Sequence, residues 1–171
     1  AGTLCCSLHA VGLQNDGVEA FLKLMLPPLP WRDFAIFANL YATSAEVFGE
    51  LAGMLASHEG VAALEVNISC PNVSAGGVLF GQDPKQAAAV TEAVRKRSGD
   101  LPVFVKLSPN VTDITVIAKA VESAGAHAVS CINTLQGMAL DLRTRKPRLA
   151  TVVGGLSGPP ISPVALRRVW T

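Results

Sequence analysis

Short apolar runs alternate with longer amphipathic segments along most of the chain. Four short runs, rich in apolar and β-branched residues, are predicted to be buried strands: 33–39, 61–68, 101–107 and 128–133. Four longer segments place apolar residues at helical spacing and are predicted to be helices: 18–26, 44–57, 84–98 and 113–124. Strands that are apolar on both faces and separated by helices indicate an α/β fold with a parallel sheet.

Local signals mark the ends of several predicted helices. Thr43 and Glu46 have the spacing of a capping box, and Asp83 followed by Pro84 is typical of a helix start. Gly125 is predicted to end the helix before it. A long Gly-rich stretch then extends to Pro163, after which a further helix is expected to begin.

The spacing of the predicted strands leaves two architectures open. Successive strands begin roughly 30 residues apart, which is the length of one βα unit. A closed eight-unit barrel needs about 250 residues, and this chain has 171. The chain starts at Ala1 and stops within the predicted helix at Thr171. We therefore favour a partial parallel (β/α)8 TIM barrel of about five βα units over an open doubly wound sheet.

Composition excludes several classes of function. The chain is 50% hydrophobic and 16% charged, with a formal net charge of +1, so neither disorder nor a nucleic-acid-binding surface is expected. No apolar run reaches the roughly 18 residues of a membrane span, and no signal peptide is visible. The four cysteines lack the spacing of a zinc site. The sequence predicts a cytoplasmic protein without a metal site, a membrane anchor or a nucleic-acid partner.

Polar residues gather where the predicted strands end. Asn39, Asn67, Lys106 and Asn133 end successive strands or follow them directly, and the carboxyl ends of parallel strands meet at one edge. Amides both donate and accept hydrogen bonds, which suits a planar heterocycle. The lysine could hold a carbonyl, a phosphate or a negatively charged reduced ring. The Gly-rich segment 154–158 could offer backbone N–H groups to a phosphate.

Cys70 is the candidate catalytic residue. It follows a buried strand directly, precedes Pro71, and lies between Asn67 and Asn72. A thiol with a lowered pKa could act as a base or a nucleophile, whereas the alternative is a small buried hydrophobe. Acyl transfer by this cysteine would require a partner histidine, for which only His9 is a candidate.

Several long motifs resemble the dihydroorotate dehydrogenase family. They are Asn67-Ile68-Ser69-Cys70-Pro71-Asn72-Val73, Val105-Lys106-Leu107-Ser108-Pro109-Asn110-Val111-Thr112-Asp113-Ile114, Ile132-Asn133-Thr134-Leu135 and Gly154-Gly155-Leu156-Ser157-Gly158-Pro159. The resemblance implies an FMN-containing (β/α)8 barrel, here the central part of one domain over residues 1–171 without the N- and C-terminal strands. It implies a flavoprotein oxidoreductase that converts dihydroorotate to orotate in pyrimidine biosynthesis.

The sequences of these motifs are most similar to those of the cytosolic, NAD-linked B-type of the family. That subclass implies a partner electron-transfer subunit carrying FAD and a 2Fe–2S cluster, and a homodimer of the catalytic chain. The alternatives are a dihydropyrimidine dehydrogenase-like flavoenzyme, in whose motif His commonly follows Cys-Pro where this chain has Asn72, and an inactive barrel fragment.

The resemblance also assigns roles to individual residues. Cys70 is implied to remove the C5 proton of dihydroorotate while the C6 hydride passes to the flavin. The implied substrate-binding residues are Asn67, Asn72, Asn133, Thr134, His9, Gly12 and Leu13. The implied FMN-binding residues are Asn39, Asn67, Lys106, Ile132 and Gly158. His9 stands where the family usually has asparagine, and the family's early lysine and late phosphate-binding loops have no counterpart here.

Overall fold

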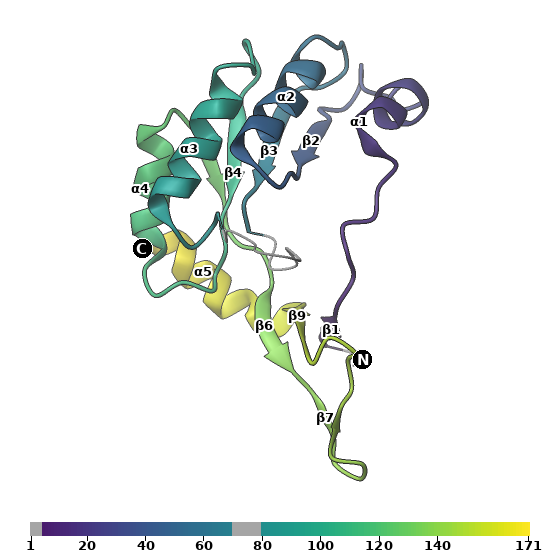
Figure 1. Ribbon diagram of the computed structural model, residues 1–171, viewed down its shortest axis with the longest axis vertical. Coiled ribbons are helices and arrows are strands. Elements are labelled where there is room, and N and C mark those ends of the chain that lie inside the picture. The colour runs from purple at the N-terminus through teal and green to yellow at the C-terminus, as the bar shows by residue number, and fades with distance from the viewer. Residues whose placement is uncertain (1–4, 70–79) are drawn as a thin grey trace.

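The computed structural model describes residues 5–69 and 80–171, and its centre is a parallel sheet (Figure 1). The sheet consists of four strands in the order in which they follow one another along the chain: β2 (Phe37–Leu40), β3 (Ala63–Asn67), β4 (Val103–Lys106) and β5 (Ala128–Ser130). The first three are followed by helices α2 (Ala45–Ala56), α3 (Pro84–Arg95) and α4 (Ile114–Ser123).

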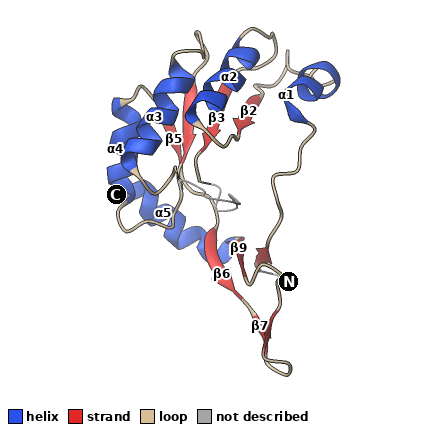
Figure 2. Cartoon of the chain, in the orientation of Figure 1, coloured by secondary structure: helices blue, strands red, loops and turns tan. Residues whose placement is uncertain are grey.

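These helices lie side by side along one face of the sheet (Figure 2). A doubly wound sheet would place helices on both faces and reverse its strand order at one point. Sequential strand order with helices on a single side is instead the arrangement of a (β/α)8 barrel. The predicted partial barrel is confirmed. The described residues provide four parallel strands rather than about five, because no such strand precedes the N-terminal helix.

The ends of the elements follow local hydrogen bonding. The β2 strand starts later than predicted because the backbone N–H groups of Asp33 and Phe34 bond to the Pro30 carbonyl in a turn, at 2.9 and 3.0 Å. Thr43 is not the cap of α2, since the side chain of Ser44 accepts the capping N–H at 3.3 Å.

The other predicted helix signals are confirmed. Asp83 caps α3 by accepting two backbone N–H groups, at 2.7 and 3.0 Å, with Pro84 in the first turn. Gly125 follows α4 with a φ of +96°, a conformation that glycine adopts without strain.

The core lies between the sheet and its helix layer. Leu64 and Val66 of β3 and Val103 and Val105 of β4 are 0% exposed and form part of the core cluster that also contains α3 residues such as Val90. Burying a side chain of this size stabilises the fold by about 1.5–3 kcal/mol. Alternation along each strand turns the intervening residues to the opposite face, away from α2, α3 and α4.

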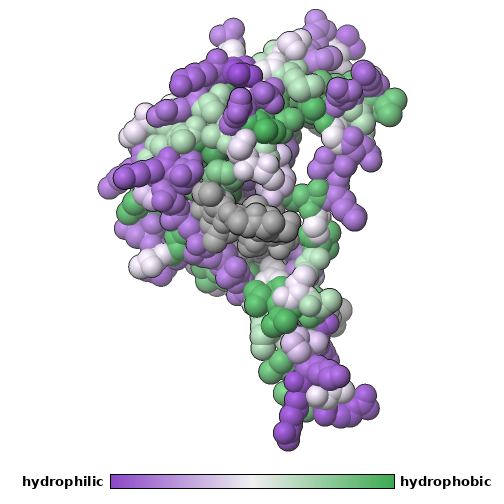
Figure 3. Space-filling model, viewed as in Figure 1, coloured by the Kyte–Doolittle hydropathy of each residue, from purple (hydrophilic) through white to green (hydrophobic). Residues whose placement is uncertain are grey.

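A second sheet extends from the barrel portion as an arm (Figure 1). Its three antiparallel strands are ordered β1 (Ser7–His9), β9 (Val153–Ser157) and β6 (Leu135–Met138). Beyond them, β7 (Leu140–Asp141) and β8 (Lys146–Pro147) form a hairpin whose tip is hydrophilic (Figure 3). This sheet occupies much of the predicted Gly-rich stretch.

Glycines in β9 are required by close packing. A Cβ on Gly154 would lie 2.4 Å from Leu149 Cδ1 and 2.5 Å from the His9 carbonyl oxygen. Because β9 is the central strand, it pairs with β1 on one side and β6 on the other. The expectation that segment 154–158 cradles a phosphate through its N–H groups is therefore not met over Gly154–Ser157, where the backbone forms the sheet.

Short helices complete the described chain. Near β2 lie α1 (Gly17–Ala20) and the π-helical turn η1 (Phe21–Met25), which together replace the predicted helix 18–26. After β9 come the 3-10 turn η2 (Pro159–Ile161) and α5 (Ser162–Trp170). No helix within 5–69 or 80–171 combines the length and apolar character needed to cross a bilayer.

Candidate functional site

A cavity of about 450 Å³ lies between the carboxyl ends of the parallel strands and the arm. The sheet contributes Asn39, Asn67 and Lys106, and the segment after β5 contributes Asn133 and Thr134. The arm and the N-terminal segment supply the remaining lining residues: His9, Val11, Leu13, Gln136, Thr151, Val153, Gly154 and Gly155. The predicted convergence of polar strand ends is thus present.

The predicted site residues fall into three groups by their position in the structure. Seven of them line this cavity: His9, Leu13, Asn39, Asn67, Lys106, Asn133 and Thr134. Gly12, Ile132 and Gly158 are not among its lining residues, and Ile132 packs against the core instead. Cys70 and Asn72 lie outside the described residues.

Ser69 joins two of the predicted substrate-binding asparagines. Its hydroxyl donates to Asn67 Oδ1 at 2.8 Å and accepts from Asn133 Nδ2 at 2.9 Å. The Ser69 side chain is buried, and its backbone N–H also bonds to Asn67 Oδ1 at 3.3 Å. The end of β3 and the segment after β5 are therefore held in one hydrogen-bonded chain. Sequence reasoning gave Ser69 no role, although it directly precedes the candidate cysteine.

Glu65 is a second organising residue that the sequence analysis missed. It lies on the face of β3 away from α2, α3 and α4, two residues before Asn67. Its carboxylate accepts from Asn39 Nδ2 at 2.5 Å and from Ser130 Oγ at 2.7 Å, which links β2, β3 and β5. The sequence does indicate that Glu65 and Asn67 share a face, because residues two apart on a strand point the same way. The rule that strand ends converge does not include Glu65.

Asn110 connects the loop after β4 to the arm. Its Nδ2 donates to the Thr134 carbonyl at 3.1 Å, and its Oδ1 accepts the Gln136 N–H at 3.0 Å. The loop is held in turn by Arg168 of α5, whose guanidinium donates to the carbonyls of 109, 111 and 112 at 3.3, 2.9 and 3.3 Å. The arm is thereby fixed to the parallel sheet next to the cavity.

Lys106 supplies positive charge to the cavity. Among the residues that the structure describes, the only ion pair is the exposed one between Lys23 and Glu19, at 3.6 Å. The Lys106 ammonium is therefore not neutralised by any described carboxylate within ion-pair distance. Its hydrogen-bonding capacity is suited to a ligand carbonyl or a developing negative charge.

Thr134 can occupy its position because its neighbour Gly155 has no side chain. A Cβ on Gly155 would lie 2.6 Å from Thr134 Oγ1 and 3.0 Å from Thr134 Cβ. Contacts of that length force the neighbour to move. Glycine at 155 thus allows Thr134 to keep its position in the cavity wall.

The described cysteines differ from one another in their surroundings. Cys131 is half-buried against the core, and burial raises the pKa of its thiol. A raised pKa lowers the thiolate fraction at neutral pH and makes this residue a poor nucleophile. Within 5–69 and 80–171, no three His, Cys, Asp or Glu side chains gather in a group able to hold a metal ion.

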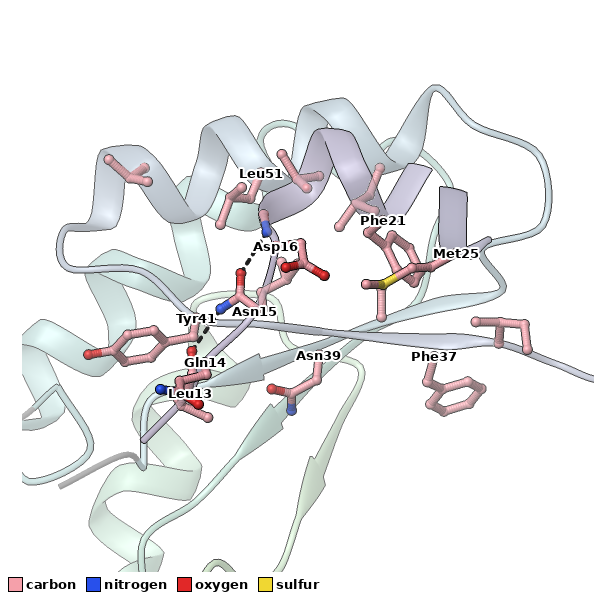
Figure 4. A pocket seen from close by; sticks show the side chains of 17 residues that line it. Leu13, Gln14, Asn15, Asp16, Phe21, Met25, Phe37, Asn39, Tyr41 and Leu51 are labelled. Atoms are coloured by element: carbon pink, nitrogen blue, oxygen red, sulfur yellow. Dashed lines mark hydrogen bonds between the residues drawn. The ribbon is translucent and has the colours of Figure 1, made fainter. Parts of the chain in front are cut away.

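A second cavity, of about 560 Å³, lies along the edge of β2 (Figure 4). Leu13 and Asn39 line both cavities, while α2 and η1 give this one a largely apolar wall that includes Leu51 and Phe21. The segment before α1 is held by Asn15, which donates to the Leu13 carbonyl at 2.8 Å and accepts a backbone N–H at 3.0 Å. Asn67, Lys106 and Asn133 line only the first cavity.

The side chains of the first cavity offer amides, hydroxyls, one imidazole and one ammonium, and Glu65 is engaged by protein partners. Such groups bind an uncharged planar ring with several carbonyl and N–H groups. The fold and this site together define part of a (β/α)8-barrel protein with a ligand site at the carboxyl ends of its strands.

Comparison with known proteins narrows the class further. The family described as Dihydroorotate dehydrogenase matches residues 2–171. The chain belongs to the dihydroorotate dehydrogenase family.

Individual relatives carry a more specific name. The chain is 66% identical over 170 residues to the "Dihydroorotate dehydrogenase B (NAD(+)), catalytic subunit" of Solidesulfovibrio magneticus, covering 99% of this chain and 56% of that protein. The protein of the same name from Maridesulfovibrio salexigens is 64% identical, with the same coverage. That from Geobacter sp. (strain M21) is 55% identical over 163 residues, covering 95% of this chain and 53% of that protein. The chain thus spans about half the length of these relatives.

Proposed function

We propose that this chain is part of the catalytic subunit of a B-type dihydroorotate dehydrogenase, which oxidises dihydroorotate to orotate in pyrimidine biosynthesis. The observation that carries the proposal is the convergence of Asn39, Asn67, Lys106 and Asn133 on one cavity at the strand ends. Family membership supports the same reaction. Residues 1–171 would form the central part of one FMN-binding barrel domain.

The donor set fits the ring of FMN. The isoalloxazine ring presents carbonyl oxygens and one ring N–H on its pyrimidine edge. Asn39 and Asn67 offer amide groups, and the Lys106 ammonium has no ion pair among the described residues. FMN, when bound, would accept the hydride from C6 of dihydroorotate. Lys106 would stabilise negative charge on the ring, since an ammonium interacts favourably with a nearby anion.

The remaining cavity residues would hold the substrate. Asn67, Asn133 and Thr134 provide donors and acceptors for a pyrimidine, and Ser69 fixes the first two. His9 and Leu13 lie on the side of the cavity formed by the N-terminal segment. Gly12, beside Leu13, and Asn72 complete the proposed substrate set, while Ile132 and Gly158 complete the FMN set through their backbones.

Cys70 is the proposed base. It would take the C5 proton of dihydroorotate on its sulfur as the hydride leaves C6. Support comes from its place directly after Ser69, which borders the cavity residues, and from the family motif. Positioned general bases contribute about 10²–10⁴-fold to rate.

The proposal includes partners and a location. The relatives are named catalytic subunits of an NAD(+) enzyme, which supports a partner electron-transfer subunit that would carry FAD and a 2Fe–2S cluster. A homodimer of catalytic chains and a cytoplasmic location complete the proposal.

The test uses the full-length protein and its Cys70→Ala and Cys70→Ser variants. The wild-type protein should carry FMN and oxidise dihydroorotate but not dihydrouracil. The alanine variant should keep FMN and lose at least about 10²-fold in turnover, and the serine variant should retain weak activity. Alanine-variant turnover equal to wild type would remove Cys70 from the mechanism. Preference for dihydrouracil would favour the dihydropyrimidine dehydrogenase alternative, and a protein without FMN would favour an inactive fragment.

A further inference from the structure

Glu65 lies beneath the cavity and does not itself line it. It is half-buried on the face of β3 away from α2, α3 and α4, one strand away from Asn39 and two strands away from Ser130. The parallel register pairs Asn39 directly with Glu65, so the two side chains are nearest neighbours on this face. A carboxyl group in this place can control the residue beside it.

The chemistry of the pair fixes which end of the Asn39 amide faces Glu65. A carboxylate oxygen accepts hydrogen bonds, and the Asn39 group that contacts it is the Nδ2 donor. The 2.5 Å contact between Asn39 Nδ2 and Glu65 Oε2 has this polarity. The other carboxylate oxygen is engaged by the Ser130 hydroxyl at 2.7 Å. Both partners of Glu65 are therefore donors, and its orientation is set from two sides.

One consequence concerns what Asn39 offers to a ligand. With Nδ2 turned toward Glu65, Oδ1 is the Asn39 group available to the cavity, and it can only accept. Oxidised isoalloxazine carries a single ring N–H donor, at N3, between two carbonyl groups. An acceptor is complementary to N3–H and repels the flanking carbonyl oxygens.

We propose that Glu65 is a positioning residue, which holds the Asn39 amide with Oδ1 toward the cavity so that it accepts a hydrogen bond from N3–H of the flavin. This inference rests on the proposed FMN site. Without Glu65, the amide can rotate, and half of its orientations present a donor where the ligand also has a donor. The net value of one such hydrogen bond corresponds to about a tenfold change in affinity.

The decisive experiment is a double-mutant cycle on the full-length protein, with FMN affinity measured by titration of the apoprotein. Glu65→Met keeps the volume but removes both acceptors, and it should weaken FMN binding about tenfold. Asn39→Ala should weaken it to a similar extent. Because Glu65 acts through Asn39, the double variant should bind FMN no more weakly than Asn39→Ala alone. Additive losses would show that Glu65 acts by another route.

Two further variants separate orientation from strand joining. Glu65→Gln can accept from Asn39 and donate to the Ser130 hydroxyl, so FMN affinity should stay within about threefold of wild type. Ser130→Ala removes only the second contact of Glu65 and should also stay within about threefold. A tenfold loss in either variant would overturn the inference, and this holds even if Glu65→Met does not fold.

The chemistry at the flavin is tested with FMN methylated at N3, which lacks the donor. Wild-type protein should prefer FMN over this analogue, and Glu65→Met and Asn39→Ala should lose much of that preference. Equal discrimination by wild type and both variants would overturn the assignment to N3–H. A wild-type protein that binds no FMN would overturn the proposed function itself, whereas normal FMN binding by Glu65→Met would overturn only the role of Glu65.

Discussion

The parallel sheet has two faces that are built from alternate residues of the same strands. On the face toward the helices, Val66 and Val105 are 0% exposed and are part of the continuous apolar core. On the other face, Glu65, Asn67 and Lys106 alternate with them and belong to the cavity or its floor. One face therefore stabilises the fold, and the other lines the cavity. Substitutions on the two faces should therefore change different measurements.

The largest effect is expected on the helix-facing side. Leu64→Ala removes a fully buried side chain and leaves a cavity in the core, so the free energy of unfolding should fall by about 2–5 kcal/mol. Urea denaturation of the full-length protein measures this change. FMN affinity of the folded fraction should stay near wild type, and a comparable loss of FMN affinity would break the separation between the faces.

The next effect belongs to the cavity face. Lys106→Met removes the ammonium without leaving a described carboxylate unpaired, so FMN affinity should fall by about 10–100-fold while the urea midpoint changes little. Lys106→Arg keeps the charge and should recover part of the affinity. A large loss of stability in Lys106→Met, with unchanged FMN binding, would contradict the proposed role.

Ser69→Ala probes the hydrogen-bonded chain between Asn67 and Asn133, the two asparagines proposed to bind substrate. Loss of the buried hydroxyl leaves Asn67 Oδ1 and Asn133 Nδ2 without this partner, which should raise KM for dihydroorotate about tenfold with FMN retained. Ser98→Ala is the matched control, since Ser98 is also buried but bonds to Arg95, and neither of these residues lines the cavity. Equal effects of the two variants on KM would argue against a specific role for Ser69.

The smallest effect tests the arm. Gly155→Ala places a methyl group 2.6 Å from Thr134 Oγ1, so Thr134 should shift and KM for dihydroorotate should rise by about threefold to tenfold. Gly53 lies in helix α2, and a methyl group added there would meet nothing closer than 3.6 Å. Gly53→Ala should therefore leave KM unchanged and slightly raise stability. Steady-state kinetics and thermal melts distinguish the two outcomes.

Much of the fold was predictable because its signals are local. Apolar runs located β2 to β5, and Asp83 and Gly125 marked helix ends that the structure confirms. The antiparallel sheet was missed because β1 and β9 are about 150 residues apart in sequence, at a separation where pairing leaves no local pattern. Glycines at 154 and 155 are typical of a loop, yet here they are required because the fold brings atoms of other segments too close for a side chain.

The site was predictable to the extent that strand ends converge. That rule placed Asn39, Asn67 and Lys106 around one cavity. It could not show that Ser69 and Glu65 hold those residues, because hydrogen-bond partners depend on register between strands. Nor could it place Ile132, which lies against the core although its neighbour Asn133 faces the cavity.

The contact between Arg168 and the loop after β4 has a consequence for how this protein tolerates change. A single guanidinium in α5 holds three carbonyls that lie 56 to 59 positions earlier in the chain. Through Asn110, that loop supports the backbone of Thr134. Distance from the cavity is therefore a poor guide to which positions tolerate substitution, and α5 is less expendable than its exposed residues suggest.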